Sequence, residues 1–588
     1  MRTKTRHAIF QPCALASAIA LGCVAPVQAV TFNIGEVEAQ FDSQLSVGAS
    51  WSVRGADPDF VSVASGGKAS SRTSDDGRLN FKKGETFSKI FKGIHDLELK
   101  YGDTGVFVRG KYWYDFETKD ESRLFYDIDD HNRKEAAQAS GAQILDAFIY
   151  HNYSIGDKPG SVRVGKQVVS WGESTFIGNS INSINPIDAA AFRRPGAEIK
   201  EGLIPVNMLY VSQSLTDSVS MEAFYQLEWD QTIVDNCGTF FSTADVLADG
   251  CEDRLVVLGP DLPPGESTNS FVDNAYIPRA GDRDARDSGQ YGLALRWFAE
   301  SLNDTEFGLY AMNYHSRAPV FSTIRTTTPN FVSFIPGAPN AGYFLEYPED
   351  IRLYGLSFQT NVGGTALSGE VSYRPNMPMQ INSTDLSFGA LGLPFNPVFE
   401  SGHAENVSGA DIHGYERKPF TQAQVTAVHF IDRVLGASRL TLLGEVGYNH
   451  ISGISDDIGE LRFGRDPIYG AGEFSVPGVC GAFNAANPDE CRGDGFYTSS
   501  SWGYRLRASA DYSNVFAGIN LTPSVAWSHD VDGYGPNFNE GSKAISIGLN
   551  ADYQNTYTAS LSYTDFFGGE YNTVTDRDFV ALSFGVNF

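Results

Sequence analysis

Residues 170–203 hold the side chains whose types and spacing are best suited to chemistry. A tryptophan, two arginines and three glutamates lie close together there: Trp171, Glu173, Arg193, Arg194, Glu198 and Glu201. A guanidinium group binds carboxylates and other anions through a planar set of donors, and arginines in a pore narrow it. We therefore expect ion pairs between the arginines and the glutamates that follow them, at the constriction of a pore.

The same segment is unusually apolar for a surface loop. Large apolar side chains recur along it: Phe176, Ile177, Ile181, Ile184, Ile187 and Phe192. Because such side chains avoid water, the segment is predicted to fold into the interior of the protein or to pack on its wall. Two roles stay open, a constriction or gate within a pore and a loop that covers its mouth.

Six further basic side chains fall within stretches of alternating polarity: Arg109, Lys111, Arg163, Arg296, Arg505 and Arg507. Around Arg109, for example, Val106 and Val108 share one parity, whereas Arg109, Lys111 and Asp115 share the other. A period of two places the two sets on opposite faces of a β-strand. We expect the charged faces to line a lumen and the apolar faces to contact lipid.

The last residues of the chain form an amphipathic strand that ends on an aromatic residue. Apolar side chains occupy every second position from Val580 to Phe588, with small or polar ones between them. Such a strand looks like the signal that the assembly machinery of bacterial outer-membrane barrels reads, although a soluble β-sandwich also has terminal strands. We assign the signal to Phe584, Val586 and Phe588 and expect these side chains to face lipid.

The amino-terminal segment predicts export. Three basic residues precede an apolar run over 14–24, and Val27-Gln28-Ala29 has the small-x-small form of a signal-peptidase site. Residues 1–29 are therefore expected to be a signal peptide. Residues 30–588 are expected to form a barrel with 170–203 as an inserted loop.

Alternating stretches recur along the whole chain and predict an all-β fold, a transmembrane antiparallel barrel of about 18 strands, with 16 as the smaller possible count. Tight turns at 102–105, 363–364 and 555–556 alternate with long polar segments that are expected to be extracellular loops: 55–86, 118–142, 170–203, 230–288, 317–349, 377–418 and 453–500. Mean hydropathy is -0.22, and the 40 Phe, 27 Tyr and 60 Gly suit a barrel in which only alternate residues meet lipid.

Composition and motifs exclude several classes of function. A net charge of -27 argues against a nucleic-acid partner and suits solvated loops facing lipopolysaccharide. The chain has no Gly-x-Ser-x-Gly and no His-Glu-x-x-His motif, and its ten histidines are dispersed. We therefore expect no enzyme, no catalytic residues and no cofactor.

Four cysteines follow the expected signal peptide, in two close pairs within long segments: Cys237, Cys251, Cys480 and Cys491. Local pairing of Cys237 with Cys251 and of Cys480 with Cys491 is the most economical of three possible connectivities. A zinc site is the rival interpretation. Its usual spacing and accompanying histidines are missing, so we expect no metal.

Four motifs carry a resemblance to a known family: FNIGE at 32–36, FDSQLSVGASW at 41–51, GKQVVSWGES at 165–174 and NPID at 185–188. They resemble an uncharacterised outer-membrane β-barrel family of proteobacteria, known only as a domain of unknown function. Its members are often encoded beside an RND-type inner-membrane transporter and a periplasmic protein similar to lipoprotein carriers. The resemblance implies these two proteins as partners and a trans-envelope route for lipids or other hydrophobic molecules.

Two transport functions in the bacterial outer membrane stay open. The apolar segment 176–192 and the resemblance favour a conduit for hydrophobic or lipid-like molecules. The charged inward side chains are also compatible with a general or small-solute diffusion porin. An outer-membrane enzyme and a purely structural barrel are the remaining alternatives. Outer-membrane lipid, lipopolysaccharide and the barrel-assembly machinery are the other expected partners.

Overall fold

The computed structural model describes residues 30–256, 263, 276–327, 341–455, 457, 459–483 and 485–588. The expected signal peptide, residues 1–29, lies outside the described residues. Among the helices that are described, none is both long and apolar enough to cross a membrane.

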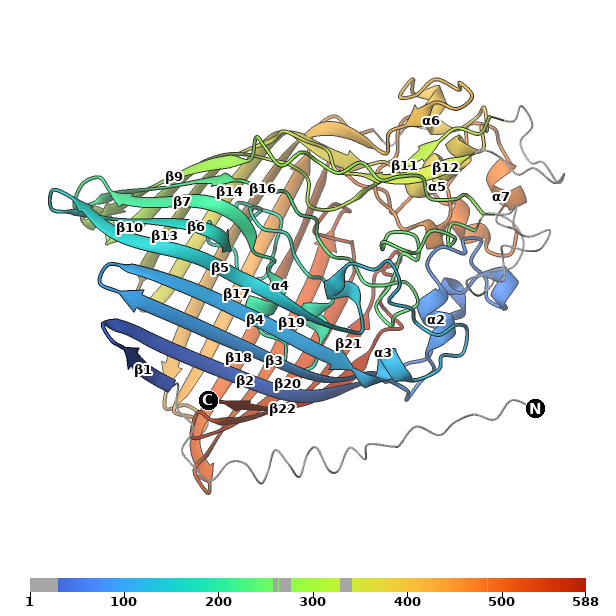
Figure 1. The fold of residues 1–588 in the computed structure, drawn as a ribbon. Coiled ribbons are helices and arrows are strands. Elements are labelled where there is room, and N and C mark those ends of the chain that lie inside the picture. Colours follow the sequence, from blue (N-terminus) through green and yellow to red (C-terminus); the bar gives the residue numbers. More distant parts are fainter. Residues whose placement is uncertain are drawn as a thin grey trace.

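A closed antiparallel β-barrel forms the body of the protein (Figure 1). The main sheet has 19 strands; without β1 (Val30–Ile34), which pairs only with β2, 18 remain in the barrel, as the alternation predicts. The barrel strands are β2 (Val37–Ser52), β3 (Thr86–Tyr101), β4 (Thr104–Asp115), β5 (Ser140–Ile155), β6 (Lys158–Gln167), β7 (Val206–Ser214), β8 (Val219–Gln226), β9 (Tyr291–Ala299), β10 (Thr305–Tyr314), β13 (Ile351–Val362), β14 (Thr365–Gln380), β16 (Tyr415–Asp432), β17 (Arg439–Ile451), β18 (Ser500–Phe516), β19 (Ile519–Asp532), β20 (Lys543–Tyr553), β21 (Tyr557–Phe567) and β22 (Phe579–Asn587).

The terminal strand β22 closes the barrel against β2. The register runs from Gln44 opposite Asn587 to Ser52 opposite Phe579, and the backbone N–H of Phe588 donates to the carbonyl of Ser43 at 2.8 Å. Closure removes the open sheet edges that hydrocarbon would leave without hydrogen-bond partners. The first and last strands therefore meet as the sequence pattern predicts.

The two faces of the wall differ as the alternation requires. Outward residues such as Leu506 and Phe584 are apolar and about half exposed, at 47% and 53%. Inward residues are polar or charged along much of the wall and apolar on β7–β13, and many are buried by side chains within the barrel. An apolar outer surface around a polar-lined closed barrel is the architecture of bacterial outer-membrane proteins. It places this protein in that membrane. Val586 points outward by parity but is only 7% exposed, because it packs between Leu45 and Tyr557.

Short turns gather at one rim and long loops at the other (Figure 1). Gly363 and Gly364, between β13 and β14, both have positive φ (57° and 82°), which a two-residue hairpin of the mirror-image type requires. In barrels of this kind the short-turn rim faces the periplasm. The long-loop rim is then the extracellular one.

The described parts of the long loops between β8 and β18 pack together into a cap on the extracellular rim, which we define as residues 227–256, 276–290, 315–327, 341–350, 381–414, 452–455, 459–483 and 485–499. The cap has its own apolar core, centred on residues such as Tyr343, Ile381 and Leu386. Its small sheet consists of β11 (Val320–Ile324), β12 (Gly342–Glu346) and β15 (Asp411–Ile412). Within the described residues the helices are α2 (Asp76–Asn80), α3 (Phe116–Asp120), α4 (Ile199–Gly202), α5 (Ser383–Ala390), α6 (Pro397–Glu400), α7 (Val479–Phe483) and the short 3-10 turns η1 (Pro58–Phe60), η2 (Val63–Ser65), η3 (Glu135–Ala137), η4 (Ala191–Arg193), η7 (Glu300–Leu302), η8 (Pro467–Tyr469) and η9 (Pro488–Cys491).

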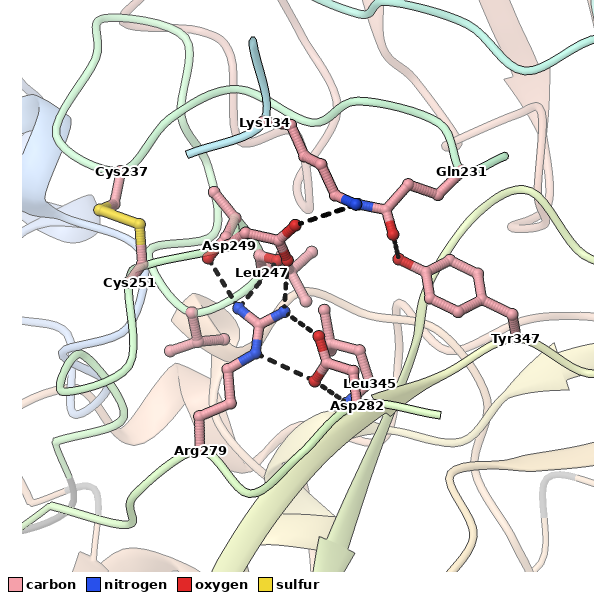
Figure 2. A network of polar contacts seen from close by, with 12 residues as sticks. Lys134, Gln231, Cys237, Leu247, Asp249, Cys251, Arg279, Asp282, Leu345 and Tyr347 are labelled. Atoms are coloured by element: carbon pink, nitrogen blue, oxygen red, sulfur yellow. Dashed lines mark hydrogen bonds and ion pairs between the residues drawn. A yellow bond between two sulfur atoms is a disulfide. The ribbon is translucent and has the colours of Figure 1, made fainter. Parts of the chain in front are cut away.

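Both expected disulfides are present, Cys237–Cys251 and Cys480–Cys491. Sulfur atoms bonded to each other do not ligate zinc, so the rival interpretation of the cysteines is wrong. Figure 2 shows the first bridge beside Arg279, which forms ion pairs with Asp249 at 3.0 Å and Asp282 at 2.6 Å. Covalent and ionic links of this kind hold the cap as a defined structure above the barrel.

Candidate functional site: a loop that bridges the lumen

Residues 168–205, between β6 and β7, turn into the barrel and are called the lumen loop. Its short helix α4 lies inside the barrel, surrounded by the strands of the wall (Figure 1). Ile177, Ile181 and Ile184 are almost fully buried, and the last two belong to an apolar cluster with inward residues of β7–β13 such as Met208 and Tyr310. The predicted inward folding is therefore confirmed. It follows from the match between an apolar loop and an apolar sector of the inner wall.

Trp171 and a charged network fix the start of the lumen loop. The indole N–H of Trp171 donates to Glu222 on β8 at 2.7 Å. Arg296 on β9 binds the same Glu222 at 3.1 Å, Glu306 at 3.1 Å and Glu173 at 3.8 Å. Three residues singled out from the sequence, Trp171, Glu173 and Arg296, thus meet in one network that binds the loop to the wall.

Two buried wall carboxylates clamp the next part of the lumen loop. Glu370 on β14 accepts hydrogen bonds from the backbone N–H groups of Glu173 and Ile181. Glu445 on β17 accepts from three successive backbone N–H groups, those of residues 175–177, at 3.0, 2.7 and 2.8 Å. Hydrogen bonds to an ionised acceptor are about twice as strong as neutral ones. These two side chains therefore hold the loop against β14–β17.

The far end of the lumen loop crosses to strands β2–β4 and β22. Lys92 on β3 pairs with Glu201 at 2.5 Å, and Lys111 on β4 pairs with Asp188 at 3.5 Å. A side chain at Gly48 on β2 would lie 2.5 Å from Pro195, so only glycine allows this approach. Because it is anchored on both sides, the loop is a bridge across the lumen.

The expected ion pairs of Arg193 and Arg194 with Glu198 and Glu201 are wrong. Arg193 instead pairs with Asp235 of the cap and stacks on Phe241 at 4.9 Å. Arg194 donates to the carbonyl of Ala136 at 2.9 Å and stacks on Trp113 at 5.3 Å. Arg193 thus reaches the cap and Arg194 reaches β4 and η3, while Glu201 turns to Lys92 and Glu198 pairs with Lys200 at 2.9 Å.

Most of the predicted basic residues of the wall are also engaged internally. Arg109 pairs with Asp96 at 2.7 Å and Asp146 at 3.3 Å, and Arg163 stacks on Tyr210 at 4.2 Å. Arg505 pairs with Asp530 at 2.6 Å. Arg507 differs from them. It is exposed, and it has no ion pair or hydrogen bond with any residue that the structure describes.

The inner wall consequently has two sectors. The packed arc is the inner face of β2–β17, which carries every anchor of the lumen loop described above. The open arc is the inner face of β18–β21, to which the lumen loop makes no hydrogen bond or ion pair within the described residues. Half-buried small hydroxyl residues recur on the open arc: Ser509, Ser524, Ser528, Ser546, Ser560 and Ser562. The loop itself exposes Phe176, Phe192 and Ile199, the last at 76%.

The alternation of Thr441, Glu445 and Asn449 puts Glu445 on the inner face of β17, but neither Glu370 nor the anchoring role of the two glutamates was predicted. The alternation of Ser368, Glu370, Ser372 and Arg374 within β14 puts Glu370 on the inner face as well. That pattern was readable in the sequence. The carboxylate's partners were not, because they lie almost two hundred residues away along the chain, with a separation of 197 for the Glu173 contact.

One group of carboxylates in the described part of the chain lies close enough together for a metal ion: Asp75 and Asp76, from the segment between β2 and β3, and Asp245 of the cap. Arg254 binds both oxygens of Asp76, at 2.8 and 2.9 Å, which supplies a positive charge without a metal. Burial raises the pKa of Asp75 to about 6 and pushes the pKa of Asp245 well above its ordinary value. This cluster is therefore sensitive to pH.

Comparison with known proteins gives a set of similar solved structures and a family match. Among curated proteins, none matches the chain. Similar solved structures include OccAB1 of Acinetobacter baumannii (10% identity, 95% of this chain, 98% of that chain, TM-score 0.39). Another is the outer membrane protein opdK from Pseudomonas aeruginosa (10% identity, 94% of this chain, 98% of that chain, TM-score 0.39). A third is the outer membrane channel DcaP of A. baumannii (11% identity, 96% of this chain, 100% of that chain, TM-score 0.34).

A family model described as "Protein of unknown function (DUF1302)" matches residues 11–588. The match covers nearly all of the barrel, the lumen loop and the cap, and it agrees with the resemblance that the four sequence motifs indicate. The chain therefore belongs to the DUF1302 family of outer-membrane β-barrels.

Proposed function

We propose that this protein transports amphipathic molecules across the outer membrane, with the lumen loop as the constriction of the path. One observation carries the proposal. The loop crosses a closed barrel and is anchored along the packed arc, while the open arc keeps partly exposed polar side chains. A bridge anchored along the packed arc leaves the partly exposed open arc as the side along which a molecule passes.

The chemistry of the two sides supports an amphipathic cargo. The open arc presents serine hydroxyls, which donate to and accept hydrogen bonds from polar groups. The loop presents Phe176, Phe192 and Ile199, whose exposure in a polar lumen costs free energy unless an apolar partner covers them. Ile177, Ile181 and Ile184 are buried as packing and line no path, whereas Ile187 is exposed at 39% and adds to this apolar surface.

A general diffusion porin is the second candidate, because the hydroxyl-rich open arc alone suits small polar solutes. The two candidates differ in what the exposed apolar side chains do. In a porin they are incidental, whereas in an amphipathic conduit they contact the cargo. A periplasmic carrier and an RND-type transporter as partners are part of the proposal and rest on the family resemblance. Chemical cross-linking in intact cells tests for these two partners.

Single-channel recording in planar bilayers tests the function. We expect the wild-type protein to conduct, and phenyl glucoside to reduce its current at lower concentration than methyl glucoside. Equal concentrations would favour the porin. A wild-type protein that inserts and stays silent would contradict both candidates.

The role of the lumen loop is tested by the double substitution Glu370→Gln and Glu445→Gln. Amides keep the size of the carboxylates but weaken the charge-assisted hydrogen bonds to the loop, by about 1 kcal/mol each. We expect larger and noisier conductance steps. The matched control is Glu400→Gln, an exposed glutamate of the cap. An unchanged conductance in the double variant would show that the loop does not constrict the path.

A further inference from the structure

We propose that Arg507 on β18 is an anion-binding position in the lumen, so that the cargo is an amphipathic acid with a carboxylate, sulfonate or phosphate head. This inference rests on the proposed transport function and narrows its substrate class.

The position of Arg507 follows from strand alternation and register. Its neighbour Leu506 faces outward and is 47% exposed. Arg507 therefore faces the lumen, like Arg505, which reaches the inward Asp530. In the register it lies opposite Leu443 on β17 and Ala526 on β19, and neither side chain offers a polar partner.

Other inward arginines have internal roles, which makes Arg507 distinctive. Arg109, Arg296 and Arg505 form ion pairs with wall carboxylates. Arg374 is fully buried and donates to the carbonyl of Ser180 at 2.7 Å. Such arginines hold the barrel and the lumen loop together. Arg507 is exposed and has no such partner within the described residues.

The carboxylates nearest to Arg507 along the strands are already occupied. Glu445 lies opposite Arg505, two residues along β17 from Leu443. It accepts the three backbone N–H groups of the loop and the hydroxyl of Thr426. Asp530 is bound by Arg505. Asp511, further along β18, accepts from Thr522 at 3.2 Å and lies opposite Arg439. The guanidinium thus remains available to an anion, which it binds through paired donors.

An apolar surface adjoins this cation. Leu443 lies beside Arg507 in the register, and Glu445, two residues along β17, holds the backbone of Phe176. Two residues of a strand span about 7 Å, so the head of a bound acid on Arg507 and its apolar body on Leu443 and Phe176 fit one small molecule. Serines of the open arc lie on the other side, at Ser509 and Ser524.

Equilibrium binding of naphthalene-2-sulfonate to the protein in nanodiscs tests the inference, with empty nanodiscs as the reference. We expect Arg507→Ala to weaken binding by at least about tenfold, since a charge-assisted pair is lost, and Arg507→Lys to restore part of it. The control is Arg352→Ala, an exposed arginine of β13 that faces outward by parity. Its binding should equal that of the wild type.

Two outcomes would overturn the inference. One is an Arg507→Ala variant that binds naphthalene-2-sulfonate as tightly as the wild type. The other is a wild type that binds inorganic sulfate as tightly as the sulfonate, because the apolar surface then contributes nothing. Both measurements are independent of conductance. A conducting wild type with unchanged binding in Arg507→Ala keeps the channel and removes the anion site, whereas a silent wild type removes the channel.

Discussion

The packed arc and the open arc belong to the same sheet and share the same alternation, yet their interiors differ. On the packed arc the inward positions hold large apolar residues such as Met208 and Tyr310, or charged residues such as Glu445, and all three are buried against the lumen loop or the wall. On the open arc many of them are small hydroxyl residues that remain partly exposed, beside charged residues such as Arg505 and Arg507. Alternation therefore builds the wall, whereas the size and charge of the inward residues decide where the loop binds.

The largest effect is expected from removing the main apolar anchor of the packed arc. Trp171→Ala deletes a fully buried side chain and leaves the indole's partner Glu222 without its donor. We expect a loss of about 3–5 kcal/mol of stability, concentrated in the lumen loop. Hydrogen exchange of residues 168–205 measures it. Trp502→Ala, on the outer face of the wall, is the control. Equal loss of protection in both variants would mean that Trp171 does not anchor the loop.

A matched pair of small inward residues compares the two arcs directly. Ala294 on β9 has no exposed surface, whereas Ser546 on β20 is partly exposed. The substitution Ala294→Leu overpacks the apolar cluster and should lower the free energy of unfolding by about 1–3 kcal/mol. In Ser546→Leu the new side chain enters the open lumen. It should lower the free energy of unfolding by less than about 0.5 kcal/mol and also lower the conductance. Urea unfolding and single-channel recording check the pair. Similar losses of stability at both positions would show that the two arcs do not differ in packing.

The smallest effect on stability is expected from pH, through the carboxylate cluster of Asp75, Asp76 and Asp245. The pKa of Asp75 rises from 3.8 to about 6 in the folded protein, so between pH 4 and 6 the folded chain holds a proton that the unfolded chain has released. Stability of this region should fall as pH rises through that window, by about 1–2 kcal/mol. Hydrogen exchange of residues 72–80 measures the change. Asp75→Asn should flatten the profile, and an unaltered profile in that variant would assign the titration to another group.

Much of the fold was readable from local pattern. The predicted count of about 18 strands equals the number in the barrel, and the turn at 363–364 lies where expected. The cysteine pairing was also predictable, because each pair is short in sequence, 14 and 11 residues apart. Partners of charged residues were not. Arg193 is five residues from Glu198 yet binds Asp235, because the backbone turn between them points the two side chains apart.

The amino-acid sequence by itself determined which faces of the strands contact lipid, the number of membrane crossings to within two strands, and which loop is too apolar to lie in water. These properties depend on periodicity and composition, and both are local. Only the tertiary structure decided that Glu370 and Glu445 clamp that loop, that most inward arginines are already paired and that Arg507 is not. Closing the barrel brings strands hundreds of residues apart to the same lumen, and no local pattern records which side chains meet there.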